Sequence, residues 1–215
     1  MTDLDPKPSA ADAALGRPER RPGCSLDALT RELRPLLAGG GHRADDGARV
    51  AALLRAYAAN EESWRSYEVY ASETYSRNLL WRDDDFEMLL LCWGEGHESP
   101  IHDHAGQQCW MAVLDGELEE VHFQVEDGEL TQGRVKSFSA GGVAFIHDDI
   151  ALHLIRPRAG TRGVSLHLYS DPIDACRIFC PDTGRAEPVE VGYHSVRGTL
   201  CSGTDPARIR DAWCE

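Results

Sequence analysis

The feature that most constrains the fold of this chain is a series of short apolar segments between residues 67 and 169. The segments are rich in aromatic and aliphatic residues, which favour strands, and Gly or Asp turns interrupt them at intervals of roughly ten residues. This pattern is typical of a sandwich or barrel and not of alternating strands and helices. We expect strands at residues 67–70, 75–81, 86–93, 108–114, 118–125, 133–138, 142–147, 153–156 and 164–169.

The region before these strands has the periodicity of two helices. Ser25 can cap a helix in which leucines recur at helical spacing, and the glycines at 39–41 end it. A second helix is predicted over residues 46–59, and we expect both helices to pack against the sheet. The predicted organisation is a disordered tail at 1–24, one domain with a helical N-terminal part at 25–205, and a C-terminal tail at 206–215.

The composition restricts the partners of this chain. Its formal net charge of -14 disfavours nucleic acid and anionic membranes, because both attract basic surfaces. No segment is apolar over the length that a bilayer requires, and the N-terminus lacks the apolar stretch of an export signal. Seven cysteines without a CxxC pair argue against a disulfide framework or a zinc ribbon. We expect a reduced, cytoplasmic monomer that acts on small molecules.

Two histidines lie two positions apart between Gly96 and Gly116. In a strand, side chains at i and i+2 leave the same face, so His102 and His104 are predicted to project together and share one metal ion. The spacing of these residues resembles the first metal-binding motif of the cupin superfamily, small jelly-roll barrels with a metal inside. Cys109 stands where that motif usually has a glutamate ligand.

A third histidine follows at the spacing of the second cupin motif. Gly142 and His153 keep that spacing, whereas Asp148 and Ile150 replace the usual Pro and Gly. Three imidazoles without a carboxylate can hold zinc, iron, copper or nickel, so the residues alone leave the metal open. Three free positions on an octahedral ion suffice for a bidentate substrate and O₂, which favours oxygen chemistry at Fe(II). The alternative is a cupin whose histidines only pack and hydrogen-bond.

Further segments resemble the cysteine dioxygenases, the thiol dioxygenases of the cupin superfamily. The resemblance implies a mainly β cupin jelly-roll barrel with N-terminal helices packed against it. It also implies Fe(II) held by His102, His104 and His153. In that family the iron binds L-cysteine through thiolate and amine, and O₂ converts the thiol to cysteine sulfinic acid. The resemblance rests on residues 75–79, 91–97, 101–104, 109, 153, 164–170 and 193–195.

The resemblance also implies roles for other side chains. Arg77 corresponds to a clamp that holds the substrate carboxylate with two parallel hydrogen bonds, and Tyr75 shares its strand face. Ser165, His167 and Tyr169 alternate along one strand and correspond to a hydrogen-bonded chain that ends at the iron pocket. The apolar residues between these three fit a buried face on either side, so periodicity alone also permits a solvent face for the polar residues.

Cys109 and Tyr169 correspond to a pair that forms a thioether crosslink beside the iron in animal members of the family. Many bacterial members have glycine in place of the cysteine, so the presence of Cys109 predicts that the crosslink can form here.

Other functions stay open. Dioxygenases of 3-mercaptopropionate typically carry glutamine at the position of Arg77 and glycine at that of Cys109, so Arg77 favours cysteine as the substrate. A non-enzymatic metal-binding cupin would show no turnover. A zinc hydrolase is disfavoured because no carboxylate base lies at motif distance.

Overall fold

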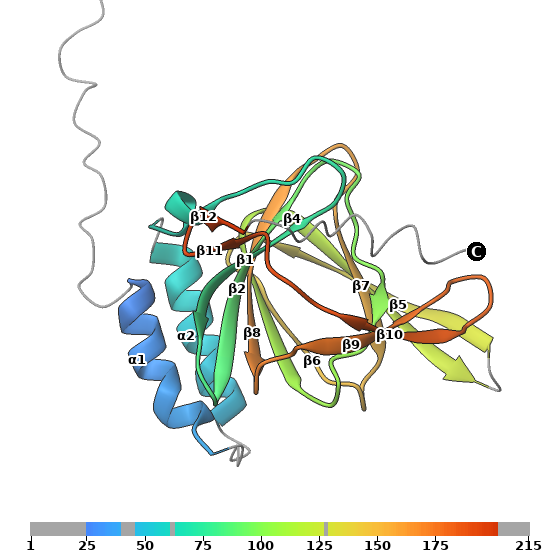
Figure 1. The fold of residues 1–215 in the computed structure, drawn as a ribbon, viewed down its shortest axis with the longest axis horizontal. Coiled ribbons are helices and arrows are strands. Elements are labelled where there is room, and N and C mark those ends of the chain that lie inside the picture. Colours follow the sequence, from blue (N-terminus) through green and yellow to red (C-terminus); the bar gives the residue numbers. More distant parts are fainter. Residues whose placement is uncertain (1–24, 40–45, 61–62, 127–128, 202–215) are drawn as a thin grey trace, which may run out of the picture.

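The computed structural model describes residues 25–39, 46–60, 63–126 and 129–201 (Figure 1). The predicted tails at 1–24 and 206–215, and the last residues of the predicted domain, lie outside this part. The helices are α1 (Leu26–Leu37), α2 (Asp46–Asn60) and the 3₁₀ helix η1 (Ser63–Tyr67). The strands are β1 (Ser76–Arg82), β2 (Phe86–Trp93), β3 (Ile101–His102), β4 (Gln108–Glu126), β5 (Glu129–Ser139), β6 (Val143–Ile146), β7 (Leu152–Pro157), β8 (Gly163–Ser170), β9 (Ala175–Phe179), β10 (Ala186–Glu190), β11 (Ser195–Val196) and β12 (Thr199–Leu200).

Both helices form where the sequence predicts them. The Ser25 side chain caps α1 by accepting a hydrogen bond from the backbone N–H of Ala28 at 3.3 Å, which satisfies one free donor of the first turn. The helices lie on the same side of the molecule as β1, β2 and β8 (Figure 1). None of the described helices is long and apolar enough to cross a membrane. The buried faces of α1 and α2 include Leu29, Leu33, Leu36, Leu37, Val50, Leu54 and Tyr57.

The strands form two layers that share β4. The pairing path runs β10-β9-β3-β7-β4-β8-β2-β1-β11-β12, and β5 and β6 also pair with β4. The first half of β4 pairs with β8, and its second half pairs with β7 and β5. Residues 108–114 and 118–125 are therefore one strand of 19 residues, not two. The expected mainly β jelly roll is confirmed, although the path does not close on itself within the described residues.

Both faces of β8 are buried. The alternation of polar and apolar residues along this strand left open whether its polar residues face solvent, and the burial answers that question. Val164, Leu166 and Leu168 belong to the core cluster that contains the helices. Ser165 and His167 point the other way, as does Tyr169, which packs with the interior cluster of the jelly roll. All three are almost fully buried, so the interpretation of a solvent-facing polar row is wrong.

The sequence-based strand predictions fail mainly at the two ends of the domain. Residues 67–70 are not a strand, because the chain leaves η1 there and continues without regular structure. The strand expected around His102 is present as the short β3, whereas β9, β10, β11 and β12 have no predicted counterpart. Two of them belong to a lateral hairpin in which β10 contains Pro188, a residue that edge strands tolerate. The others have only two residues, too few to show a period.

Candidate active site

Three histidines converge inside the jelly roll. His102 ends β3 and lies opposite His153 of β7, so backbone pairing places these two rings side by side. The ring centroids lie 4.7 Å apart for His102 and His153, 4.7 Å for His104 and His153, and 5.1 Å for His102 and His104. One nitrogen of each ring lies within 4.8 Å of the others. This spacing allows three ligand bonds to one ion.

The reason for the convergence differs in part from the predicted one. The strand β3 ends at His102, so the two-residue period of a strand does not extend to His104. Ala105 and Gly106 follow with φ angles of 53° and 80°, and this tight turn reverses the chain towards β4. The expected common direction of the two imidazoles is therefore produced by a strand end followed by a turn.

Each of the three histidines has an oxygen behind its Nδ1 atom. Pro100 O lies 2.9 Å from Nδ1 of His102, and Glu120 Oε1 lies 3.0 Å from Nδ1 of His153. Asp148 Oδ1 lies 3.4 Å from Nδ1 of His104. The contacts of His102 and His153 leave their Nε2 lone pairs for a metal, whereas Nδ1 of His104 makes no hydrogen bond among the described residues. Sequence reasoning missed Glu120, which belongs to no motif.

The donor set fits a divalent transition metal. The Nε2 atoms of His104 and His153 are buried and have no hydrogen-bond partner among the described residues. Burial and the neighbouring imidazoles hold the pKa values of His102 and His153 well below the ordinary value, so both rings are neutral donors. Three neutral imidazole nitrogens suit iron, zinc, copper or nickel. Two buried lone pairs without a protein partner are the direct sign of a metal site here.

The turn that carries His104 is braced by two acidic side chains. Asp148 accepts hydrogen bonds from the backbone N–H groups of His104 and Gly106, both at 2.7 Å. Burial alone would raise the pKa of Asp148, but these bonds and the His104 ring outweigh it and hold the pKa well below its usual range. Asp103 accepts from the side chain and the backbone of Arg177, at 2.6 and 2.8 Å. Asp148, which departs from the usual cupin motif, is therefore a structural support.

The polar residues of β8 form a continuous contact chain. Trp93 donates to Ser165 Oγ at 2.9 Å, Ser165 Oγ lies 3.0 Å from His167 Nε2, and His167 Nδ1 lies 3.3 Å from the Tyr169 hydroxyl. Burial raises the pKa of Tyr169 well above its ordinary value and lowers that of His167 well below its own. The phenol is therefore protonated and the imidazole neutral. Trp93 is a member of the chain that sequence reasoning missed.

Arg77 and Tyr75 line the same pocket as His102 and His104. The Arg77 guanidinium donates through Nε to Gly192 O at 3.2 Å, whereas one of its terminal nitrogens is buried without a hydrogen-bond partner among the described residues. Tyr75 stacks on Trp93 with ring centroids 4.6 Å apart. A buried guanidinium with a free donor is prepared for an anion. Cys176 also lines this pocket.

Cys109 lies directly opposite Tyr169 in the pairing of β4 with β8. Its side chain is almost fully buried, and burial raises the pKa of its thiol. The sulfur lies 3.9 Å from Nδ1 of His167. The expected neighbourhood of Cys109 and Tyr169 is thus present.

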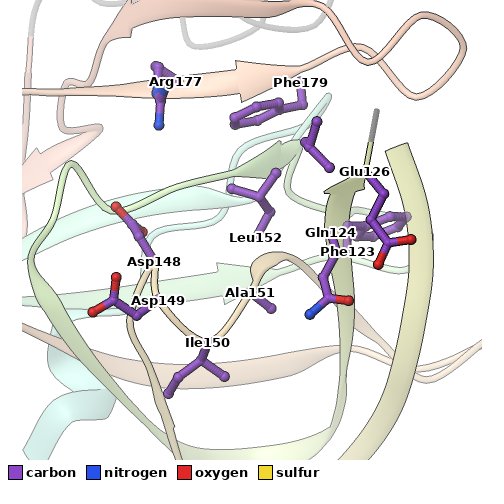
Figure 2. Close-up of a pocket in the computed structure, with 11 residues that line it drawn as sticks. Phe123, Gln124, Glu126, Asp148, Asp149, Ile150, Ala151, Leu152, Arg177 and Phe179 are labelled. Atoms are coloured by element: carbon purple, nitrogen blue, oxygen red, sulfur yellow. The ribbon is translucent and has the colours of Figure 1, made fainter. Parts of the chain in front are cut away.

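A larger hollow of about 530 Å³ lies on another part of the surface (Figure 2). The end of β4, the loop before β7, and Arg177 and Phe179 of β9 line it, and none of the three histidines does. Two of its lining residues are Arg177, which pairs with Asp103, and Asp148, which braces the histidine turn. Among the described residues, one cluster of three possible metal ligands occurs, and two of its members, His102 and His104, line the smaller pocket. We therefore place the chemistry there.

Comparisons with known proteins identify the family of this chain. The sequence pattern of the family described as "Cysteine dioxygenase type I" matches residues 19–181. Cysteine dioxygenase type 1 of Rattus norvegicus is 36% identical over 179 residues, which cover 81% of this chain and 88% of the relative. The Homo sapiens protein of the same name is 35% identical with the same coverage. That of Danio rerio is 36% identical over 152 residues, which cover 68% of this chain and 76% of the relative. The chain therefore belongs to the cysteine dioxygenase type I family.

Proposed function

We propose that this protein is an Fe(II)-dependent dioxygenase that oxidises the thiol of L-cysteine to cysteine sulfinic acid. The observation that carries the proposal is a cluster of three converging imidazoles, two of which line one pocket together with a buried guanidinium that has a free donor. The reaction adds both atoms of O₂ to the sulfur, so it needs no further oxidant or reductant. The described cysteines are all free, which supports action in the reducing cytoplasm, and we expect a monomer.

His102, His104 and His153 would hold the iron through their Nε2 atoms. Because all three donors are neutral, the ion would keep its charge for an anionic thiolate. The chemistry that bound Fe(II) supplies is the activation of O₂ beside the coordinated thiolate. The protein excludes water from these reactants, since the side chains of His104 and His153 are almost fully buried.

Arg77 would bind the carboxylate of the substrate. An amino acid that chelates a metal through thiolate and amine carries its carboxylate on the carbon next to the amine, so a second positive group beside the metal can hold it. The bond from Arg77 Nε to Gly192 O orients the guanidinium and leaves a terminal nitrogen for the substrate. A planar fork matches a carboxylate better than an ammonium group does.

The contact chain on β8 would orient a proton at Tyr169. In the arrangement that we propose, Ser165 accepts from Trp93 and donates to His167 Nε2, and His167 Nδ1–H donates to the Tyr169 oxygen. The Tyr169 O–H is then free to donate to the bound substrate or to an oxygen atom. The raised pKa of Tyr169 keeps this proton in place at neutral pH. Cys109, opposite Tyr169, would bond covalently to its ring with O₂ as the oxidant.

The proposal is tested by loading the purified protein anaerobically with Fe(II) and then adding air-saturated thiol. We expect O₂ uptake and sulfinate formation with L-cysteine, and much lower rates with 3-mercaptopropionate. If 3-mercaptopropionate is oxidised as fast as L-cysteine or faster, the assignment of L-cysteine as the preferred substrate is wrong. An absence of O₂ uptake with every thiol, from protein that retains iron, would favour a non-enzymatic metal-binding cupin.

A further inference from the structure

Glu120 is a buried carboxylate that belongs to neither metal-binding motif. It lies in the second half of β4, and its side chain is 1% exposed. A carboxylate in this position costs free energy unless several partners compensate for the lost water. One of those partners is the candidate ligand His153, whose Nδ1 atom lies 3.0 Å from Oε1. The pairing of β4 with β7 sets this contact, because Glu120 lies opposite Ile155, two residues from His153.

The second oxygen of Glu120 faces two other nitrogen atoms. His122, two residues later on the same face of β4, has its Nε2 atom 2.9 Å from Oε2. Lys136 is the cross-strand neighbour of Glu120 on β5, and its ammonium lies 3.6 Å from the same oxygen. Both nitrogen atoms lie within ion-pair distance of Oε2, but neither makes a hydrogen bond to it, so among the described residues hydrogen bonding fixes the carboxylate from the His153 side alone. Its position is determined by two strand pairings and does not depend on a mobile loop.

The contact with Glu120 determines how the His153 ring is protonated. A carboxylate oxygen has no hydrogen to donate, so the bond requires a proton on Nδ1 of His153. The lone pair then lies on Nε2, the buried atom without a protein partner that faces the other two histidines. A carboxylate behind a metal-bound imidazole also makes the imidazole a stronger donor.

The partners of the other two histidines do not supply the same charge. The partner of His102 is the neutral carbonyl of Pro100. Asp148, behind His104, is 22% exposed and divides its oxygens between two backbone N–H groups. The Glu120 side chain is almost fully buried, and one of its two carboxylate oxygens contacts the candidate ligand His153. The cluster of candidate ligands contains three imidazoles and no carboxylate, so a negative charge reaches the metal site most directly through Glu120.

We propose that Glu120 is a positioning residue for the metal: it fixes the orientation and the tautomer of His153, and it supplies from behind that ring the negative charge that the three-histidine set lacks. This inference rests on the proposed metal site but not on the identity of the thiol substrate. It assigns to strand β4 a part in metal binding that no spacing of metal-ligating residues in the sequence indicates.

The test measures metal binding and not turnover. Wild-type protein, Glu120→Gln and Glu120→Leu are titrated anaerobically with Fe(II) against a competing chelator, and the Co(II) forms are compared by their d–d absorption. Glutamine keeps a hydrogen-bond acceptor for His153 but removes the charge, whereas leucine removes both. Glu119→Gln is the matched control, because Glu119 is the adjacent residue and its carboxylate pairs with Arg156 at 2.9 Å, away from the metal site.

We expect Fe(II) affinity to fall about 10-fold in Glu120→Gln and about 100-fold in Glu120→Leu, with a shifted Co(II) spectrum in both. Glu119→Gln should match the wild type. Wild-type affinity and spectrum in Glu120→Gln would overturn the inference, even if the leucine variant fails to fold. An equal loss in Glu119→Gln would also overturn it. If the wild type binds neither ion, the proposed metal site fails as well, whereas metal binding without cysteine oxidation would overturn only the proposed substrate.

Discussion

At the scale of single residues, burial decides what a side chain can do. Arg77 is 9% exposed, and an arginine in such a position needs acceptors for its donors. The carbonyl of Gly192 satisfies Nε, but one terminal nitrogen has no protein acceptor among the described residues. A substrate carboxylate would complete the set. If the guanidinium were on the surface, water would compete with the substrate carboxylate for its donors. An arginine there would discriminate little between thiols.

Replacing Arg77 with alanine should therefore weaken substrate binding more than it slows the chemical step. The lost buried contact between charges is worth about 2 to 4 kcal/mol, so KM for L-cysteine should rise by roughly 30- to 700-fold. Arg77→Lys, which keeps the charge but not the planar fork, should be intermediate. Steady-state O₂ uptake at varied L-cysteine measures both variants. An unchanged KM in Arg77→Ala would exclude Arg77 as the clamp.

The pair of Cys109 and Tyr169 gives a second expectation at this scale. The two residues face each other across β4 and β8, so a bond between them requires no change of fold. After aerobic turnover with Fe(II), the intact mass of the protein should decrease by two hydrogens. Cys109→Ala should show no decrease, and Cys92→Ala, which removes another buried thiol, should show the wild-type decrease. An unchanged wild-type mass at full activity would contradict the crosslink.

At the scale of elements, β4 connects the two layers. Gly116 marks the transition: residues before it pair with β8, and those after it pair with β7 and β5. Its φ is 76°, in the left-handed region, and a Cβ atom would lie 2.3 Å from the carbonyl oxygen of Arg162. Glycine permits both this conformation and this close approach. The residues on either side of it contribute Cys109 to one wall of the site and Glu120 to the other.

Gly116→Ala should consequently destabilise the protein by more than backbone strain alone. Gly160 is a matched control, because its φ is also 76° but no atom lies within 4 Å of the position that a Cβ atom would take there. Gly160→Ala should cost about 1 to 2 kcal/mol from the left-handed backbone. Gly116→Ala should cost clearly more, since backbone atoms must also move. Urea unfolding measures the difference, and equal losses would contradict a role of close approach at Gly116.

At the scale of the whole molecule, the site lies between two layers of strands. The helices pack on one layer, and the three histidines belong to the other. The layer of β1, β2 and β8 is packed on its outer face by α1 and α2, so every residue of β2 and β8 is buried. The histidines come from β3, from the turn after it and from β7, in the other layer. A metal would tie these segments together. Metal binding and global stability should thus be coupled.

Fe(II) at 100 times its dissociation constant should stabilise the folded protein by about 2.7 kcal/mol. For a chain of this size, that corresponds to a rise in Tm of about 5 to 10 °C. Anaerobic calorimetry with and without Fe(II) measures it. His153→Ala should lose the iron and show no such rise, whatever the effect of the substitution on the metal-free protein. A wild-type Tm that does not respond to Fe(II) would argue against the site.

Some of the site follows from the sequence because the relevant signals are local. Motif spacing identified His102, His104 and His153, and helical periodicity located both helices. The pattern Ser-x-His-x-Tyr placed three polar residues on one face of a strand. These inferences need only the repeat of a strand or a helix and the family resemblance. The close approach of His104 to the other two rings needed a turn that the strand period did not predict.

The sequence by itself determined the family, the class of fold, the three histidines and the residues that face them along β8. Only the tertiary structure decided which face of β8 is polar and buried, that Nε2 of His153 has no protein partner among the described residues, and that Glu120 lies behind His153. The physical reason is the range of each interaction. Periodicity follows from the local backbone, whereas burial, tautomer and the placement of a distant carboxylate follow from strand register and from packing between layers.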